Sequence, residues 1–443
     1  MAKKKQIELT IEEKLQNALV PKEEQPYKIP SNWCWTYIHN IAIVVTGKTP
    51  SKKNKEYYGG KFPFFKPADL DAGRNMQYAT EYLSEKGKSI SVIIPEKSTG
   101  ICCIGTIGKC GYFLVEGTTN QQINTVISKI NPLYSYYFFN TNSFVRELIS
   151  KASATTIAIV NKSKLESCLF SVAPLNEQQR IVNRIESLFA KLDRAKELIE
   201  NTLAQFEENK MAILHKAFTG ELTVKWRKKN NIDLSSWKKY ELKEVFKVVK
   251  DKYNPQIENQ IVNYIGLENI ETSKGIINKN NSSEVKSIKT KFKKDDVLYG
   301  KLRPYLNKHD VVNFDGICST DILVFRFDNI NTAKYINYYF NLPMFIQYAV
   351  ENSSGINLPR VSEKTISKYK ISLPIIEEQQ EIVNILDKLL AKYNKIKNLE
   401  QQLEKIELLK KAILAKAFRG ELGTNNPDEE SAENLLKEIL AEK

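Results

Sequence analysis

The chain contains few of the residues from which metal sites and disulfide frameworks are built. Its 443 residues include only three histidines and six cysteines, and the cysteines are scattered apart from the adjacent Cys102 and Cys103. This distribution shows neither the ligand spacing of a zinc site nor the pattern of a secreted disulfide scaffold. We therefore expect no bound metal, and reduced, buried thiols that pack as small apolar side chains.

Long apolar runs are also missing. No run approaches the roughly 18 residues that a membrane-spanning helix requires. The N-terminal stretch "MAKKKQIELTIEEKLQNALVP" is charged and amphipathic, and it lacks the apolar core of a secretory signal. These absences disfavour a membrane protein and a secreted protein, so we expect a cytoplasmic one.

Catalytic motifs are absent or incomplete. Ala42–Thr49 has the spacing of a phosphate-binding loop, but alanine replaces its first glycine and Pro50 follows where a helix should begin. A strand that ends in a basic turn is favoured there. The Asn-Pro pairs continue with Leu, Gln or Asp, whereas an amino-methyltransferase needs a second proline and an aromatic residue. Glu284–Lys286 lacks the upstream Pro-Asp pair of a nuclease centre. We expect neither catalysis nor a cofactor bound by this chain.

Positive charge is what the chain has in excess. Lysine and arginine number 66 against 52 aspartates and glutamates, for a net charge of +14. This balance favours an anionic partner, either nucleic acid or an acidic membrane surface. The length suggests two to four domains of roughly 150 residues each, and a hydrophobic content of 42% is enough to fill their cores.

An internal repeat organises the chain. Glu177–Lys191 matches Glu378–Lys392 at 9 of 15 positions, and Ala212–Leu222 matches Ala412–Leu422 at 9 of 11. Apolar residues of the first copy recur in alternating steps of four and three, which is the pattern of a helix packed against another helix. The sequence therefore contains two copies of one long helix.

The second copy lacks one residue. The deletion falls between Ile396 and Leu399, where two steps of three follow each other and local overwinding is expected. At the start of the first copy, Asn176 and Gln179 have capping-box spacing. Glu377 replaces that asparagine in the second copy, so its cap should be weaker.

The segments that precede the two helices share one order of features. Each has a tryptophan, strand-like runs with Gly and Asn turns, an aromatic helical stretch and a closing strand. We therefore expect an α+β protein with two globular β-rich domains, separated by two long antiparallel coiled-coil helices with pseudo-two-fold symmetry. The expected parts are an N-terminal amphipathic segment (1–29), a first domain (30–173), a central helix (174–222), a second domain with its linker (223–373), a C-terminal helix (374–422) and a tail with a short helix (423–443).

Two short amphipathic segments lie near the ends of the chain. Ile7–Val20 and Ala432–Leu440 have no obvious apolar stripe to join within the chain. We expect both to pack on partner chains.

A duplicated domain at each end of a helix pair suits the symmetry of DNA. Half-sites on one face of the duplex lie one helical turn apart, about 34–36 Å. Together with the positive charge, this predicts a bipartite DNA reader in which the helix pair sets the spacing between half-sites.

The whole pattern resembles the specificity subunit of a type I DNA restriction–modification system. The resemblance rests on "ALVPKEEQPYKIPSNWCW", "GKTPSKKNKEYYGGKFPFFKPADL", "SSGINLPRVSEKTISKYKISLPIIEEQQEIVNILDKLLAKY" and the two "KAF-x-GEL" ends, in this order. Around Ala154 to Val160 the first domain keeps the spacing of "SSG…LPR" but not its residues.

The resemblance implies a set of partners. Each domain would be a target-recognition domain that reads one half of a split sequence in double-stranded DNA. The helices would dock two adenine-methyltransferase subunits, which ATP-driven translocase–nuclease subunits join. S-adenosylmethionine, ATP and Mg²⁺ would then belong to those partners.

Candidate DNA contacts follow from residue type, since Lys and Arg contact phosphates and Arg, Asn and Gln read base edges. In the first domain they are Lys48, Thr49, Ser51, Lys52, Lys53, Lys61, Asn120, Gln121 and Gln122. In the second domain they are Lys286, Lys289, Lys291, Lys301, Arg303, Tyr305, Asn307, Asn357 and Arg360. Arg303 ranks highest because Pro304 restricts its backbone. A solvated loop is the alternative for residues 48–61, and turn capping is the alternative for the three amides.

Two other functions stay open. The chain could serve a combined restriction–methylation enzyme that cuts beside its site, in which case one adjacent gene would carry both nuclease and methyltransferase motifs. It could also be a coiled-coil scaffold that binds only protein, in which case any DNA affinity would not weaken steeply with salt.

Overall fold

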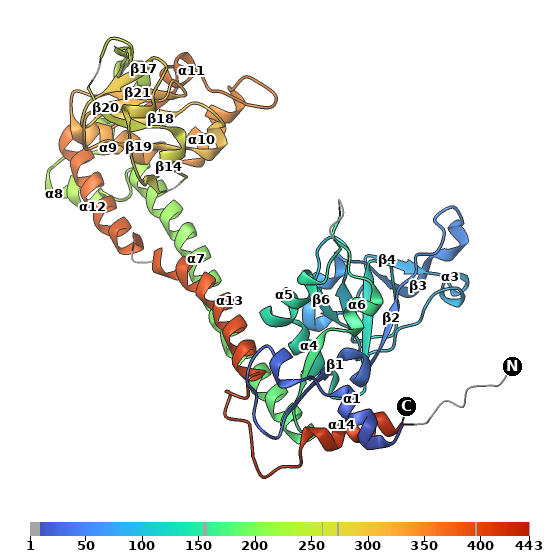
Figure 1. Ribbon diagram of the computed structural model, residues 1–443. Coiled ribbons are helices and arrows are strands. Elements are labelled where there is room, and N and C mark those ends of the chain that lie inside the picture. Colours follow the sequence, from blue (N-terminus) through green and yellow to red (C-terminus); the bar gives the residue numbers. More distant parts are fainter. Residues whose placement is uncertain (1–8, 154–156, 259, 273, 395–396, 443) are drawn as a thin grey trace. The chain divides into compact units, whose positions relative to one another are not determined.

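The computed structural model describes residues 9–153, 157–258, 260–272, 274–394 and 397–442 (Figure 1). The chain divides into two compact units, one built from Met1–Leu198 with Gln401–Lys443 and the other from Ile199–Glu400. Each unit combines helices with sheets, which confirms the expected α+β class. All six cysteines are free and buried, as expected. In the described ranges no helix is long and apolar enough to cross a membrane.

A four-stranded antiparallel sheet in the order β2-β8-β5-β6 forms the centre of the first unit. The strands of this unit are β1 (Cys34–Tyr37), β2 (Ala42–Thr46), β3 (Tyr58–Phe65), β4 (Glu81–Leu83), β5 (Thr99–Cys102), β6 (Cys110–Tyr112), β7 (Thr118–Thr119), β8 (Ile123–Ser128) and β9 (Leu169–Val172). β3 pairs with β4 and β7, and β1 pairs with β9. In β2, Ala42 and Val44 are buried while Ile43 is exposed, so this β-branched strand buries one face.

Helices cover this sheet. The helices of the first unit are α1 (Ile11–Ala18), α2 (Ile38–Ile41), α3 (Glu85–Ser89), α4 (Pro132–Phe139), α5 (Asn142–Ser150), α6 (Lys162–Glu166), the beginning of α7 (Leu175–Phe218), most of α13 (Lys397–Ala417) and α14 (Ala432–Ala441). α4 packs against β5, β6 and β8, and Figure 1 shows it beside β6. It begins where Asn131 caps the backbone N–H groups of Leu133 and Tyr134 with Pro132 at the first helical position.

The second unit repeats this design. Its strands are β10 (Lys238–Glu241), β11 (Lys247–Val248), β12 (Lys252–Tyr253), β13 (Asn263–Ile265), β14 (Ile270–Glu271), β15 (Gly275–Ile276), β16 (Asn280–Asn281), β17 (Lys289–Phe292), β18 (Val297–Gly300), β19 (His309–Val311), β20 (Gly316–Cys318), β21 (Ile322–Arg326) and β22 (Lys370–Leu373). The sheet β11-β21-β18-β19 has the strand order of β2-β8-β5-β6, and the pair β10-β22 corresponds to β1-β9. The prediction of one fold in both domains is therefore confirmed.

The two units differ in their second sheet. Three strands, β4-β3-β7, form it in the first unit, whereas five, β12-β17-β20-β13-β16, form it in the second. The helices of the second unit are the end of α7, α8 (Val224–Lys229), α9 (Ile330–Tyr339), α10 (Pro343–Glu351), α11 (Glu363–Ser367) and α12 (Ile376–Asn394).

In the first unit, α7 and α13 run antiparallel. Asp193 pairs with Lys410 at 2.5 Å and Lys196 with Glu407 at 3.6 Å, so numbering rises along one helix as it falls along the other. Ile181 and Ile185, which are four residues apart in the apolar pattern of the first helix, are fully buried. Ion pairs at such exposed positions fix register more than they add stability.

The repeated phenylalanines pack in the same way in both units. Phe418 lies 5.0 Å from Tyr134 and 5.2 Å from Phe138, measured between ring centroids. Phe218 lies 5.0 Å from both Tyr335 and Tyr339. The end of each repeated helix is thus fixed in an aromatic core built by α4 or α9.

The other repeated segment, Glu177–Lys191 and Glu378–Lys392, begins in both copies with a buried glutamate that has a structural role. Glu378 accepts hydrogen bonds from Trp237 Nε1 at 3.0 Å, and from Thr223 Oγ1 and Arg227 Nη1 at 2.6 Å each. Thr223 and Arg227 follow the "KAFTGEL" end of α7, so the start of α12 holds the chain that leaves α7.

Glu177 plays the same part in the first unit. It accepts from Trp33 Nε1 at 2.7 Å, from Asn425 Nδ2 at 2.9 Å and from Thr424 Oγ1 at 3.3 Å. In each unit, a buried glutamate therefore links the domain's tryptophan, the start of one repeated helix and the segment that follows the end of the other.

The predicted helix caps need partial correction. α7 begins at Leu175, so Asn176 lies inside its first turn and forms no capping box with Gln179. Gln178 instead donates to the carbonyl of Ala173 at 2.8 Å, outside the helix. Beyond the two helix ends, Gly220 and Gly420 adopt a positive φ, at 79° and 73°, which glycine favours in a C-terminal cap. The overwinding predicted between Ile396 and Leu399 involves Ile396, which lies outside the described residues.

The prediction that both amphipathic ends pack on partner chains is wrong for the described residues. α1 and α14 pack against each other inside the first unit (Figure 1). Leu15 and Ala18 share one core with Leu436 and Ile439, and Lys437 pairs with Glu12 at 3.0 Å. Each of these two terminal helices therefore buries its apolar face against the other.

Acidification is expected to destabilise the second unit through His309. Its Nδ1 donates to Asn337 Oδ1 at 2.7 Å, and its Nε2 accepts from Asn307 Nδ2 at 3.1 Å, which fixes a neutral ring. Burial lowers the pKa of His309 to about 4. The unfolded chain binds the proton first as pH falls below about 6.5, so roughly 3 kcal/mol should be lost between pH 7 and pH 4.

Urea unfolding across this pH range measures the loss. His309→Phe should flatten the pH dependence between pH 6.5 and pH 4, whereas replacement of the exposed Lys293 by alanine should leave it as in the wild type. An unchanged slope in His309→Phe would assign the pH dependence to other groups.

Candidate nucleic-acid interface

In the first domain, two predicted segments meet beyond the end of β2. Thr49 Oγ1 donates to Gln121 Oε1 at 2.5 Å, and the Lys48 backbone N–H donates to the carbonyl of Thr119 at 2.9 Å. Of the predicted contacts, Lys48, Ser51, Lys52 and Lys53 are exposed in the segment that follows β2, and Lys61 is exposed in β3. The strand with a basic turn that was expected in place of a phosphate-binding loop is therefore confirmed.

The amides of this region divide into two groups. Asn120 is buried, accepts from the Gln122 backbone N–H at 3.1 Å and donates to Gln122 Oε1 at 2.9 Å. Turn capping, the alternative considered from the sequence, describes Asn120 and Gln122. Gln121 is exposed and stays a candidate for contact with base edges.

In the second domain, two loops are joined at their bases. The first is the loop after β18, which contains Lys301, Arg303 and Tyr305. The second is the loop between α10 and α11, which contains Asn357 and Arg360. The Arg303 backbone N–H donates to the Pro359 carbonyl at 2.7 Å, and the Val361 N–H donates to the Lys301 carbonyl at 3.0 Å. The two predicted clusters therefore form one surface.

Arg303 stands out within this surface. Its φ of 52° lies in the left-handed region, although it is not a glycine and it precedes Pro304. Such a conformation costs about 1–3 kcal/mol and persists only where its surroundings hold it. Its side chain is exposed, as are those of Tyr305 and Asn357, while Arg360 Nε lies 3.4 Å from Asp321 Oδ1.

Two predicted contacts in the second domain are already engaged within it. Asn307 is only 8% exposed and its Nδ2 donates to the Phe340 carbonyl at 3.0 Å. We therefore correct the prediction for Asn307, whose amide serves the interior. Lys291 pairs with Glu258 at 2.6 Å and lowers the pKa of that carboxyl, so its charge is partly neutralised.

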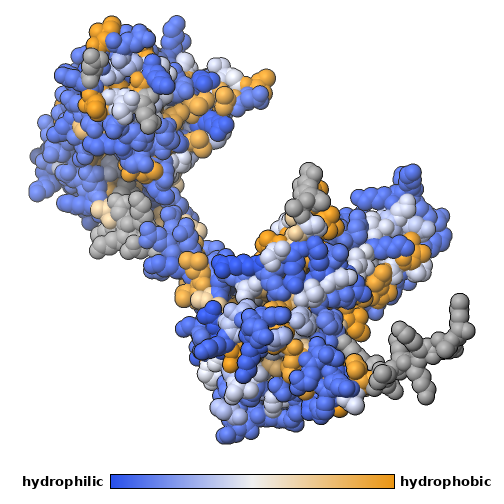
Figure 2. Space-filling view, in the orientation of Figure 1, coloured by the Kyte–Doolittle hydropathy of each residue, from blue (hydrophilic) through white to orange (hydrophobic). Residues whose placement is uncertain are grey.

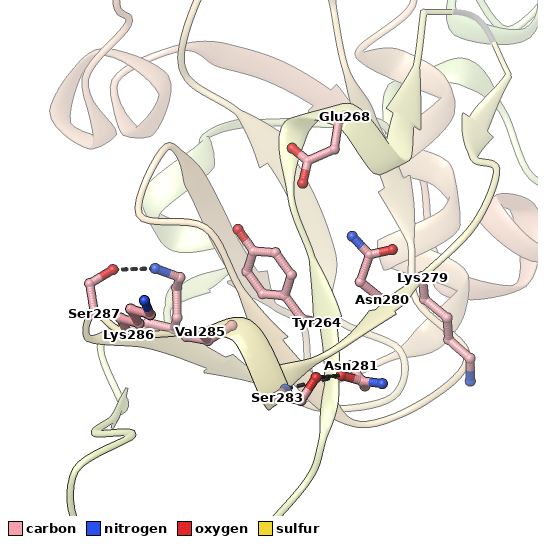
Figure 3. A pocket seen from close by; sticks show the side chains of 10 residues that line it. Tyr264, Glu268, Lys279, Asn280, Asn281, Ser283, Val285, Lys286 and Ser287 are labelled. Atoms are coloured by element: carbon pink, nitrogen blue, oxygen red, sulfur yellow. Dashed lines mark hydrogen bonds between the residues drawn. The ribbon is translucent and has the colours of Figure 1, made fainter.

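A polar pocket of about 740 Å³ contains the remaining predicted lysines, Lys286 and Lys289. Figure 3 shows the Tyr264 ring at the centre of the lining, with Asn280 on one side and Lys286 and Ser287 on the other. Lys289 Nζ donates to Ser287 Oγ at 2.5 Å and lies 5.9 Å from the Tyr264 ring centroid. Amides beside cations and an aromatic face are groups that recognise nucleotides.

Sequence reasoning missed the other residues of this lining, which are Tyr264, Glu268, Lys279, Asn280, Asn281, Ser283, Val285 and Ser287. The amide-rich run "NKNNSS" at residues 278–283 was the available signal, since it combines three amides and a lysine with two hydroxyls. Within the described residues, no group of three or more His, Cys, Asp or Glu side chains could hold a metal ion.

A family model described as type I restriction modification DNA specificity domain matches the chain twice, over residues 30–205 and 235–408. Together the matches cover more than half of the chain. Each includes one domain and continues into the repeated helix that follows it.

Curated relatives match along most of the chain. It is 25% identical to the type I restriction enzyme EcoDI specificity subunit of Escherichia coli, over 94% of this chain and 96% of that one. It is 26% identical to the EcoKI specificity subunit of Escherichia coli strain K12 over the same shares. The MjaIX specificity subunit of Methanocaldococcus jannaschii is 25% identical over 90% and 96%.

Solved structures share the fold. A chain from work titled "Structural basis underlying complex assembly and conformational transition of the type I R-M system" aligns over 89% of this chain and 100% of its own, with a TM-score of 0.68 and 18% identity. The HsdS subunit from Thermoanaerobacter tengcongensis aligns over 90% and 99%, with a TM-score of 0.54 and 18% identity.

Proposed function

The chain belongs to the type I restriction–modification DNA specificity family, and from this premise we propose that each of its two domains reads one half of a bipartite DNA sequence. It is a specificity subunit with two target-recognition domains. As such it supplies DNA recognition, and catalysis resides in partner subunits.

The observation that carries the proposal is a repeated scaffold with unlike loops. The two central sheets share their strand order, yet equivalent loops carry different side chains. The bridge between Leu302 and Arg360 in the second domain corresponds to the bridge between Ile104 and Ile159 in the first, so Arg303 and Arg360 stand where the first domain has Gly105 and Ile159. A DNA site whose halves differ in sequence requires this combination, because base edges are read by side chains on a constant framework.

DNA, methyltransferase and restriction subunits are the partners that the family implies. We further propose that two methyltransferase subunits dock on the outer faces of α7, α12 and α13, and that translocase–nuclease subunits join them. Leu408 and Leu409 support this, since they are 63% and 50% exposed on α13 and belong to no core of the described chain. S-adenosylmethionine, ATP and Mg²⁺ would be bound by those partners.

Exchange of residues 30–173 for the equivalent domain of another specificity subunit is expected to change one half of the methylated sequence only. The physical reason is that each domain has its own core and its own loops. Mapping of adenine methylation across the host genome, with and without the exchange, measures the outcome. Deletion of the gene is the control and should abolish the bipartite pattern. Methylation that persists after deletion, or a change in both halves, would contradict the proposal.

A further inference from the structure

The loop between α10 and α11 ends in an apolar tip. Ile356 is 101% exposed and Leu358 is 43% exposed. Figure 2 shows hydrophobic atoms at the end of the loop that projects from the second unit. Exposed isoleucines are common singly, but one at the summit of a projecting loop, with a leucine two residues away, is placed to contact a partner.

The base of this loop is fixed. Ser354 and Arg360 exchange two backbone hydrogen bonds, of 2.9 and 2.8 Å, and the Arg303 N–H donates to the Pro359 carbonyl at 2.7 Å. Gly355 has a φ of +102°, and a Cβ there would lie 2.9 Å from the Leu358 carbonyl oxygen. The glycine is therefore required for the turn, and the tip is presented by an ordered hairpin.

Cations surround the base of the apolar tip. Arg303 is exposed beside it, Arg360 closes the hairpin, and Lys301 precedes Arg303. Asp321, 3.4 Å from Arg360 Nε, offsets part of this charge. An apolar side chain flanked by arginines is the arrangement with which proteins enter the minor groove, since the cations contact phosphates while the apolar group separates two stacked base pairs.

We propose that Ile356 is a wedge that inserts between two base pairs from the minor groove, with Arg303 and Arg360 on the neighbouring phosphates. The proposal rests on the proposed function, because it needs the second domain to lie on its DNA half-site. It adds that recognition there includes deformation of the duplex, so the bases at the wedged step affect affinity through how easily they unstack.

The first domain has a hairpin at the same position. The Ser153 N–H donates to the Ile159 carbonyl at 3.0 Å, and Ile157 is 57% exposed. Residues 154–156 lie outside the described part of the chain, so the wedge is assigned in the second domain only.

Duplexes with 2-aminopurine at successive steps of the second half-site test the wedge. The sequence of this half-site is taken from methylation mapping. The duplexes are then bound to the full chain in complex with its methyltransferase partner. Apart from the position where the methyltransferase flips out its target adenine, the wild-type complex should raise the fluorescence at one further step, where the wedge unstacks the base. Ile356→Ser should remove this increase and weaken binding by about 10-fold to 100-fold, the value of burying one aliphatic side chain. Ile257→Ser, at a position 76% exposed in another loop of this unit, is the matched control and should change neither.

The outcomes separate the two proposals. Wild-type complex that does not distinguish the mapped site from other DNA would refute the proposed function itself. Specific binding with an unchanged fluorescence profile in Ile356→Ser would overturn the wedge alone. Weaker assembly of Ile356→Ser with the methyltransferase in the absence of DNA would also overturn it, because the tip would then contact protein.

Discussion

Replacement of Glu378 by alanine is expected to lower the free energy of unfolding of the second unit by about 3–5 kcal/mol. The carboxylate is fully buried and receives hydrogen bonds from Trp237, Thr223 and Arg227. Without it, the buried Arg227 guanidinium keeps only Thr223 Oγ1 and the Gly220 carbonyl as partners. An uncompensated buried charge is among the most destabilising changes a core can receive. Urea unfolding followed by tryptophan fluorescence measures the loss.

Glu377→Ala is the matched control, because Glu377 is exposed and directly precedes Glu378 in α12. It should change stability by less than about 0.5 kcal/mol. Glu378→Gln keeps the shape of the side chain and loses the charge, so its effect should fall between the two. If Glu378→Ala costs no more than Glu377→Ala, the glutamate does not hold the helix junction together.

The equivalent change in the first unit should cost less. Glu177 has the neutral partners Trp33, Thr424 and Asn425. Its removal leaves unsatisfied donors but no unpaired cation, so Glu177→Ala should cost about 1–3 kcal/mol. Arg180, the nearby cation, has its own partner in Glu429 at 2.6 Å.

Local features of the fold were predictable from the sequence because they depend on local periodicity. The strand predicted within Ala42–Thr49 is β2, and the aromatic helical stretch of the first domain is α4, Pro132–Phe139. The repeat then implied that the two domains share one strand order. Both inferences need only neighbours in sequence or a comparison of two segments.

Contacts between distant segments could not be predicted in this way. Glu378 meets Thr223 across 155 positions, and Lys437 meets Glu12 across 425. The sequence of an amphipathic helix does not show which other helix will cover its apolar face. For this reason α1 and α14 were predicted to pack on partner chains. The sequence also did not show which side chains are exposed. Tyr305 and Asn307 were both predicted to contact DNA, but Tyr305 is exposed and Asn307 is buried.

Lengthening both helices by four residues is expected to lengthen the gap between the DNA half-sites by one or two base pairs. The inserts are duplicates of Leu192–Ala195 in α7 and of Glu404–Glu407 in α13, which lie beside the facing ion pair Lys196–Glu407. Four residues add about 6 Å and turn the helix about 40° beyond a full turn. One base pair adds about 3.4 Å and roughly 35°, so length and rotation both agree with one to two base pairs. Methylation mapping should recover both half-sites unchanged.

A seven-residue duplication in both helices tests whether the helices set the spacing between the half-sites or whether the protein merely tolerates inserts. It adds about 10.5 Å, the length of three base pairs, but almost no net rotation, whereas three base pairs rotate by roughly 100°. The half-sites would then be met on the wrong face of the duplex, and methylation should be lost although the apolar seam stays in register. A four-residue duplication in α7 alone should also abolish methylation, because it shifts Lys196 away from Glu407. If the paired four-residue variant still methylates the original spacing, α7 and α13 do not set the distance between the half-sites.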